Sequence, residues 1–160
     1  MANTTVAGID VVAEQNTQEI IVTRTFPTSR ERVFNVYTDP ALIPQWWGPS
    51  RMTTVVDVMD VQPGGRWRHV QREADGSVHA FHGVYHDVVA PERLASTFEY
   101  EGTPGQVSLD ITTFTEAGGQ TTVSIHSIFQ SVSDRDGMLD AGMISGLSET
   151  LQRIELLLTP

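Results

Sequence analysis

Alternation of apolar and polar residues runs through most of the chain between residues 19 and 129 and predicts β-strands there. The first candidate, residues 19–26, is rich in β-branched side chains and ends at Pro27. Further segments of this kind are separated by turn residues such as Asp75-Gly76 and Gly118-Gly119; they are residues 52–61, 65–72, 77–89, 93–100, 107–115 and 121–129. Because strands joined by short turns pair antiparallel, the pattern predicts one antiparallel sheet of about six or seven strands.

Two short helices are expected directly after the first strand. Thr28-Ser29-Arg30-Glu31 fits a capping box, in which Thr28 is the N-cap and Glu31 reaches back to it, for a helix to about residue 37. Asp39-Pro40 repeats the start signal, with a carboxylate cap followed by proline, for a helix that ends at Trp46 or Trp47.

The segment from Asp134 to about Leu158 has the spacing of a helix. Its apolar residues recur at intervals of three and four, on one stripe: Leu139, Met143, Leu147, Leu151, Ile154 and Leu158. We therefore predict an α+β fold in which one long C-terminal helix covers one face of the sheet. Residues 1–17 have no clear periodicity and are expected to form a flexible arm, which leaves residues 18–160 as a single domain.

The hairpin at Asp75-Gly76 decides which side chains face that helix. A two-residue loop would place Trp67 on the face of His82 and His86, whereas a three-residue loop over residues 74–76 places Trp67 opposite Gly83. The second register gathers the aromatic residues on one face and the arginines on the other, so we choose it. The predicted interior face then carries Trp67, His69, Gln71, His79, Phe81, Tyr85 and Asp87.

Composition narrows the function classes. The chain of 160 residues has no cysteine, which excludes disulfides and thiol chemistry. Its net charge of -10 repels phosphate backbones and argues against nucleic-acid binding. Since no apolar run is long enough to span a bilayer and no leader pattern opens the sequence, we expect no membrane span, no signal peptide and a cytoplasmic location.

Metal and phosphate sites are not indicated. His82 and His86 lie four residues apart on one predicted strand, a separation of about 13 Å, whereas zinc ligands lie about 2 Å from the ion. Gly64-Gly65 has the sequence of a turn, because no strand, loop and helix with phosphate-binding spacing surround it. We therefore expect neither a metal nor a cofactor.

Acid/base chemistry has three candidate residues on the predicted interior face. His69 or Asp87 would be the general base of a cyclase-like enzyme, and Tyr85 its hydrogen-bond donor. Each also has a structural explanation, since a core histidine or an inward carboxylate is stable when a neighbouring group hydrogen-bonds it. No arrangement of nucleophile, base and orienting group is recognisable, which weakens an enzymatic function.

An ordered set of motifs resembles a known family. The motifs are Thr38-Asp39-Pro40, Trp46-Trp47-Gly48-Pro49, Pro63-Gly64-Gly65-Arg66-Trp67, Asp75-Gly76, Gly83-Val84-Tyr85 and Pro91-Glu92-Arg93-Leu94. Over residues 18–158 the chain is similar to the bacterial homologues of the activator of the heat-shock-protein ATPase, within the START-like (SRPBCC) superfamily. The resemblance implies a helix-grip fold, in which a curved antiparallel sheet wraps round a long C-terminal helix and an apolar cavity lies between them.

The last helix departs from the family at a position that affects this cavity. The family commonly carries tryptophan after the second glycine of Gly142-Met143-Ile144-Ser145-Gly146, where this chain has Leu147. A missing indole leaves either space in the cavity or a repacked core. The predicted ligand-binding residues are Trp67, His69, Phe81, Tyr85, Met143, Ile144 and Leu147.

Three functions are compatible with these features. We favour binding or carrying of a small hydrophobic organic molecule in the cavity. The alternatives are a cyclase-like or other acid/base enzyme that uses the same cavity, and a protein-binding module like the co-chaperones of the family. The sequence leaves a protein partner and a homodimer open.

Overall fold

The computed structural model describes residues 3–6 and 8–159. Within them, nine antiparallel strands form one sheet in the order β1-β2-β3-β9-β8-β7-β6-β5-β4. The strands are β1 (Asn3–Val6), β2 (Ile9–Val12), β3 (Glu19–Phe26), β4 (Thr53–Met59), β5 (Arg66–Arg72), β6 (Val78–Val89), β7 (Arg93–Tyr100), β8 (Val107–Ala117) and β9 (Gln120–Ile128). The helices are α1 (Arg30–Thr38) and α2 (Ile43–Trp46), which follow β3, and α3 (Val132–Asp140) and α4 (Met143–Leu158), which follow β9.

The α+β class with a large antiparallel sheet and a C-terminal helix is confirmed, but the predicted number of six or seven strands is wrong. The two additional strands, β1 and β2, lie in the segment for which a flexible arm was expected. β2 pairs with β3, and its Ile9 and Val11 are buried in the core. Each of these strands has four residues, which is too short for an alternating pattern to stand out in the sequence.

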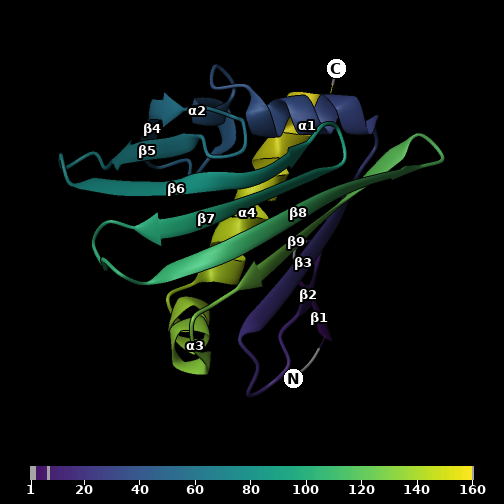
Figure 1. Cartoon of the computed structure of the whole chain (residues 1–160). Helices are drawn as coiled ribbons and strands as arrows, with labels where there is room; N and C mark the ends of the chain where they lie inside the picture. Colours follow the sequence, from purple (N-terminus) through teal and green to yellow (C-terminus); the bar gives the residue numbers. More distant parts are fainter. Residues whose placement is uncertain (1–2, 7, 160) are drawn as a thin grey trace.

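The predicted C-terminal helix is divided in two. Gly142 separates α3 from α4 and has a φ of 92°, a left-handed conformation that does not continue a right-handed helix. The prediction of one continuous helix from Asp134 is therefore wrong. α4 crosses one face of the curved sheet (Figure 1) and buries one apolar stripe against it, as the spacing predicted; its buried apolar residues are Leu151, Ile154 and Leu158.

The two short helices after β3 are present, but both start differently from the prediction. α1 has Ser29 as its N-cap in place of Thr28, and no side chain caps it. A backbone N–H of its first turn donates instead to the Glu116 carboxylate of β8, across 2.9 Å. α2 begins at Ile43, beyond the expected cap at Asp39. A contact with a distant strand thus replaces the local capping box at α1.

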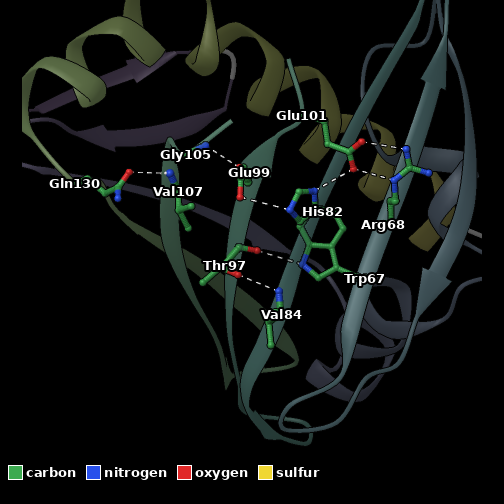
Figure 2. Close-up of polar contacts among 10 residues, drawn as sticks. All are labelled: Trp67, Arg68, His82, Val84, Thr97, Glu99, Glu101, Gly105, Val107 and Gln130. Carbon is green, nitrogen blue, oxygen red and sulfur yellow. Dashed lines mark hydrogen bonds and ion pairs between the residues drawn. The ribbon is translucent and has the colours of Figure 1, made fainter. Parts of the chain in front are cut away.

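The three-residue loop predicted for the hairpin between β5 and β6 is confirmed. Trp67 pairs with Gly83, and Gly76 in the loop has a left-handed φ of 91°. Alternate residues of β5 therefore face opposite sides of the sheet. On the outer side, the Arg68 guanidinium donates to both Glu101 carboxylate oxygens, across 2.8 and 3.0 Å (Figure 2).

Gly83 leaves room for the indole of Trp67. The indole N–H donates to the backbone carbonyl of Thr97 across 3.2 Å, and the Thr97 hydroxyl accepts a hydrogen bond from the backbone N–H of Val84 across 2.9 Å (Figure 2). A Cβ on residue 83 would lie 1.9 Å from the Thr97 carbonyl oxygen and 2.5 Å from the indole nitrogen. The absence of a side chain at this position therefore fixes where Trp67 sits, as the register predicted.

We predict that Gly83→Ala destabilises the protein by roughly 1–3 kcal/mol, because the new Cβ would clash with the backbone carbonyl of Thr97, which is held in the sheet. The measurement is chemical denaturation, with tryptophan fluorescence as a second readout of a displaced indole. Gly137→Ala is the matched control, because a Cβ there meets nothing within 4 Å and alanine favours the helix. Equal stability of the two variants would contradict the close approach.

Candidate ligand-binding cavity

A cavity of about 480 Å³ lies between the inner face of the sheet and the helices. Its walls come from all four helices, α1 to α4, on one side and from the six strands β4 to β9 on the other. Small organic ligands in proteins occupy sites of about 300–1,000 Å³. The space is therefore large enough for a molecule of one or several rings.

One end of the cavity is aromatic. Five rings contact one another there, and we call them the aromatic cluster: Trp47, Trp67, His69, Phe81 and Phe98. The ring centroids of Trp47 and Phe81 lie 5.1 Å apart, and those of Phe81 and Phe98 lie 5.6 Å apart. Edge and tilted contacts of this kind hold rings in fixed orientations. The cluster gives this end of the cavity an aromatic wall.

His69 is the polar member of this cluster. It is buried, and its Nδ1 has no hydrogen-bond partner among the described residues. Burial lowers the pKa of His69 to about 4, so the imidazole is uncharged near neutral pH. A backbone hydrogen bond with Arg68 opposes this shift, and an uncharged imidazole suits a hydrogen bond to a ligand better than proton transfer at pH 7.

A row of polar side chains crosses the floor of the cavity next to the aromatic cluster. Tyr85 of β6 pairs with Ser96 of β7, Ser96 pairs with Asp110 of β8, and Asp110 pairs with Ser127 of β9. All of them line the cavity, and we call them the polar row. Neighbouring strands lie about 4.8 Å apart, so the row spans roughly 14 Å.

Asp110 carries the only carboxylate among the residues that line the cavity in the described chain. The Ser127 hydroxyl donates a hydrogen bond to Oδ1 of Asp110 across 2.7 Å. Among the described residues, this is the hydrogen bond that the Asp110 side chain accepts. Burial raises the pKa of Asp110 to about 6, and the Ser127 hydrogen bond opposes that shift.

The sequence did not predict Asp110 as a site residue. In β8 the apolar Leu109 and Ile111 flank it, and alternation alone would place them inside and the carboxylate in solvent. A usable signal was Phe114, which shares the phase of Asp110 and is only 2% exposed. A large aromatic ring on a strand usually faces the core, so Phe114 indicates that the face of β8 with Asp110 is the inner one.

Most of the predicted ligand-binding residues lie at the cavity. Six of them line it: Trp67, His69, Phe81, Tyr85, Met143 and Leu147. Ile144 is not among the lining residues; it packs against the hydrophobic core. Contact of these residues with a ligand stays a prediction. The raised pKa of Tyr85, to about 12 through burial, keeps its hydroxyl protonated as a donor.

Asp87 was expected to face the interior, and the structure places it elsewhere. A bulge in β6 inserts His86, so that Tyr85 pairs with Ser96 but Asp87 pairs with Ala95. The extra residue reverses the alternation beyond it and turns Asp87 to the outer face. There the carboxylate forms an ion pair with Arg93. The geometry therefore removes Asp87 from the candidates for a general base in this cavity.

The remaining sequence features concern metal binding and the histidines of the described chain. No group of three or more histidine or carboxylate side chains there could hold a metal ion. His82 contacts Glu99 and Glu101 on the outer face (Figure 2). Among the described residues, no helix is long and apolar enough to cross a bilayer.

Comparison with known proteins agrees with this architecture. A model of the family described as Activator of Hsp90 ATPase homolog 1-like protein matches residues 27–159. A solved structure from Mycobacterium smegmatis has 27% identity and a TM-score of 0.85, and the match covers 98% of this chain and 97% of that one. One from Staphylococcus epidermidis has 26% identity and a TM-score of 0.77, with coverages of 89% and 90%.

The similarity to a third solved structure supports only the fold of this chain, because the sequence identity is low. It comes from Rhodobacter sphaeroides, with 21% identity, a TM-score of 0.86, and coverages of 94% of this chain and 97% of that one. No curated protein matches the sequence significantly.

The raised pKa of Asp110 predicts a pH dependence of stability. The carboxyl binds its proton more tightly in the folded protein, with a pKa of about 6, than in the unfolded chain, with a pKa of 3.8. Its contribution to stability therefore falls as the pH rises through this window. We expect Asp110→Asn to be more stable than the natural protein at pH 8, by roughly 1–3 kcal/mol, and the difference to vanish near pH 4.

Thermal unfolding of both proteins between pH 4 and 8 measures this difference. The lowered pKa of His69 makes its own contribution rise with pH, but this is common to both proteins and cancels in the comparison. Asp87→Asn on the outer face is the control and should not be stabilised at pH 8, because it removes the ion pair with Arg93. An Asp110→Asn variant that is less stable at pH 8 would contradict the assignment.

Proposed function

The chain belongs to the family of Activator of Hsp90 ATPase homolog 1-like proteins, and we propose that it binds or carries a small hydrophobic organic molecule in the cavity between its sheet and α4. This architecture, with one long helix against a curved antiparallel sheet, is the arrangement we assign to the helix-grip fold. Fold alone does not determine function, and the cavity is the feature from which we infer binding.

The observation that carries the proposal is the size and lining of this cavity. Protein interiors pack at high density and leave few voids larger than a water molecule, whereas this one measures about 480 Å³. Its lining is mostly apolar and aromatic, and its polar groups include the polar row, His69 and Gln71. Such a composition is typical of sites for small organic molecules.

The N-terminal half of α4 supports the same proposal. Met143 and Leu147 line the cavity, and Gly142 and Gly146 add no side chain beside them. A Cβ on either glycine would meet nothing within 4 Å. The helix therefore leaves space above the sheet where bulkier residues would fill it. Leu147 is the position at which a larger side chain should close this space.

Leu147→Trp is expected to weaken the binding of the uncharged, apolar fluorescent probe N-phenyl-1-naphthylamine by about tenfold or more, because the indole occupies the same volume. Leu156→Trp is the matched control, since it makes the same change on the same helix at a side chain that is 72% exposed. Probe titration and thermal unfolding are measured on both variants.

The outcome separates a hollow domain from a solid one. If the space is real, Leu147→Trp should fold with unchanged or higher stability while it binds the probe less well. A loss of about 1–3 kcal/mol through overpacking, together with no probe binding by the natural protein, would contradict the proposal.

A further inference from the structure

We propose that the cavity is selective for an amphiphilic organic amine, whose ring system lies on the aromatic cluster and whose protonated nitrogen donates to the Asp110 carboxylate. The inference rests on the proposed function, because it names the chemical class of the ligand. It assigns to Asp110 the role of a binding residue that fixes the polar end of that ligand.

Asp110 has hydrogen-bonding capacity left for a ligand. An ionised carboxylate accepts about four hydrogen bonds, and the described residues supply one, from the Ser127 hydroxyl at 2.7 Å. A half-buried carboxylate that lines a mainly apolar cavity is costly unless a donor or a cation compensates it. A ligand with an ammonium group supplies both the charge and up to three N–H donors.

No lysine or arginine lines the cavity in the described chain. The titratable groups that line it are Tyr37, His69, Tyr85 and Asp110. Burial lowers the pKa of His69 and raises those of both tyrosines, so the histidine and the two tyrosines are uncharged near neutral pH. The charge of the cavity is then set by Asp110 alone, which favours a cation and opposes an anion. A net charge of -10 adds attraction for cations at long range.

The polar row and the aromatic cluster lie within reach of one small ligand. Ser96 of the polar row and Phe98 of the cluster are two residues apart on β7, and both line the cavity. Residues with this spacing on a strand lie about 7 Å apart, which is the length of one or two fused rings. A ring system stacked on the cluster can therefore place an attached amine over the neighbouring carboxylate.

The test uses three probes with one naphthalene body: 1-naphthylmethylamine, 1-naphthalenemethanol and 1-naphthoic acid, titrated by calorimetry at pH 7.5. We expect the amine to bind about tenfold or more tightly than the alcohol, as a charge-assisted hydrogen bond predicts, and the acid to bind most weakly. In Asp110→Asn, the amine should lose this advantage while the affinity for the alcohol stays within about twofold.

Two controls keep the result specific to Asp110. Asp87→Asn removes an equal charge from the outer face and should leave all three affinities unchanged. In the natural protein, lowering the pH from 7.5 to 5 should reduce the affinity for the amine toward that of the alcohol, because the carboxyl with a pKa of about 6 takes up a proton. The amine itself stays protonated over this range.

The outcomes distinguish this inference from the proposed function. Binding of the alcohol without a preference for the amine, a preference that survives in Asp110→Asn, or tightest binding of the acid would each overturn the inference and leave a hydrophobic binding site intact. If none of the probes binds, and N-phenyl-1-naphthylamine does not bind either, the proposed function fails together with the inference.

Discussion

One helix cannot cover the inner face of nine strands, and this mismatch shapes the interior of the protein. Strands spaced by about 4.8 Å make a sheet roughly 38 Å wide, whereas a helix with its side chains is about 10–12 Å across. The C-terminal half of α4 packs tightly, with Leu151 and Ile154 at 1% exposure or less. Its N-terminal half, with half-buried Met143 and Leu147, faces the remaining sheet surface across the cavity. The part of the curved sheet from β4 to β9 encloses that space. The candidate ligand-binding site therefore exists because α4 leaves this part of the sheet uncovered.

Two local features then give the cavity its chemical character. Gly83 allows the Trp67 indole to lie across β6 and donate to the Thr97 carbonyl, which fixes the aromatic cluster at one end. The register of β6 to β9 brings Tyr85, Asp110 and two serines into one row beside it. An apolar surface and a single carboxylate are thus held on rigid strands, where side-chain positions are more precise than on loops. The combination favours a ligand that is flat at one end and carries a donor at the other.

The sequence predicted those parts that repeat along the chain or that involve bulky side chains. Sorting aromatic residues from arginines gave the correct hairpin register, and six of the seven predicted ligand-binding residues line the cavity. Features that depend on a single residue in three dimensions were not predicted. The bulge at His86 reversed the orientation of Asp87, and Gly142 interrupted a helical pattern that periodicity alone would continue. Asp110 was missed because the polar residues of β8 face the cavity, against the usual sense of alternation.

The central claim is that a ligand enters the space between the sheet and α4, and methionine methyl resonances test it most directly. The cavity is lined by Met59 of β4, Met138 of α3 and Met143 of α4, whereas Met52 does not line it. In protein labelled with ¹³C at the methionine methyl groups, titration with 1-naphthylmethylamine should shift the signals of the three cavity methionines, in a saturable manner, and leave that of Met52 unchanged. Unchanged signals of all three at saturating probe, or shifts confined to Met52, would contradict the account.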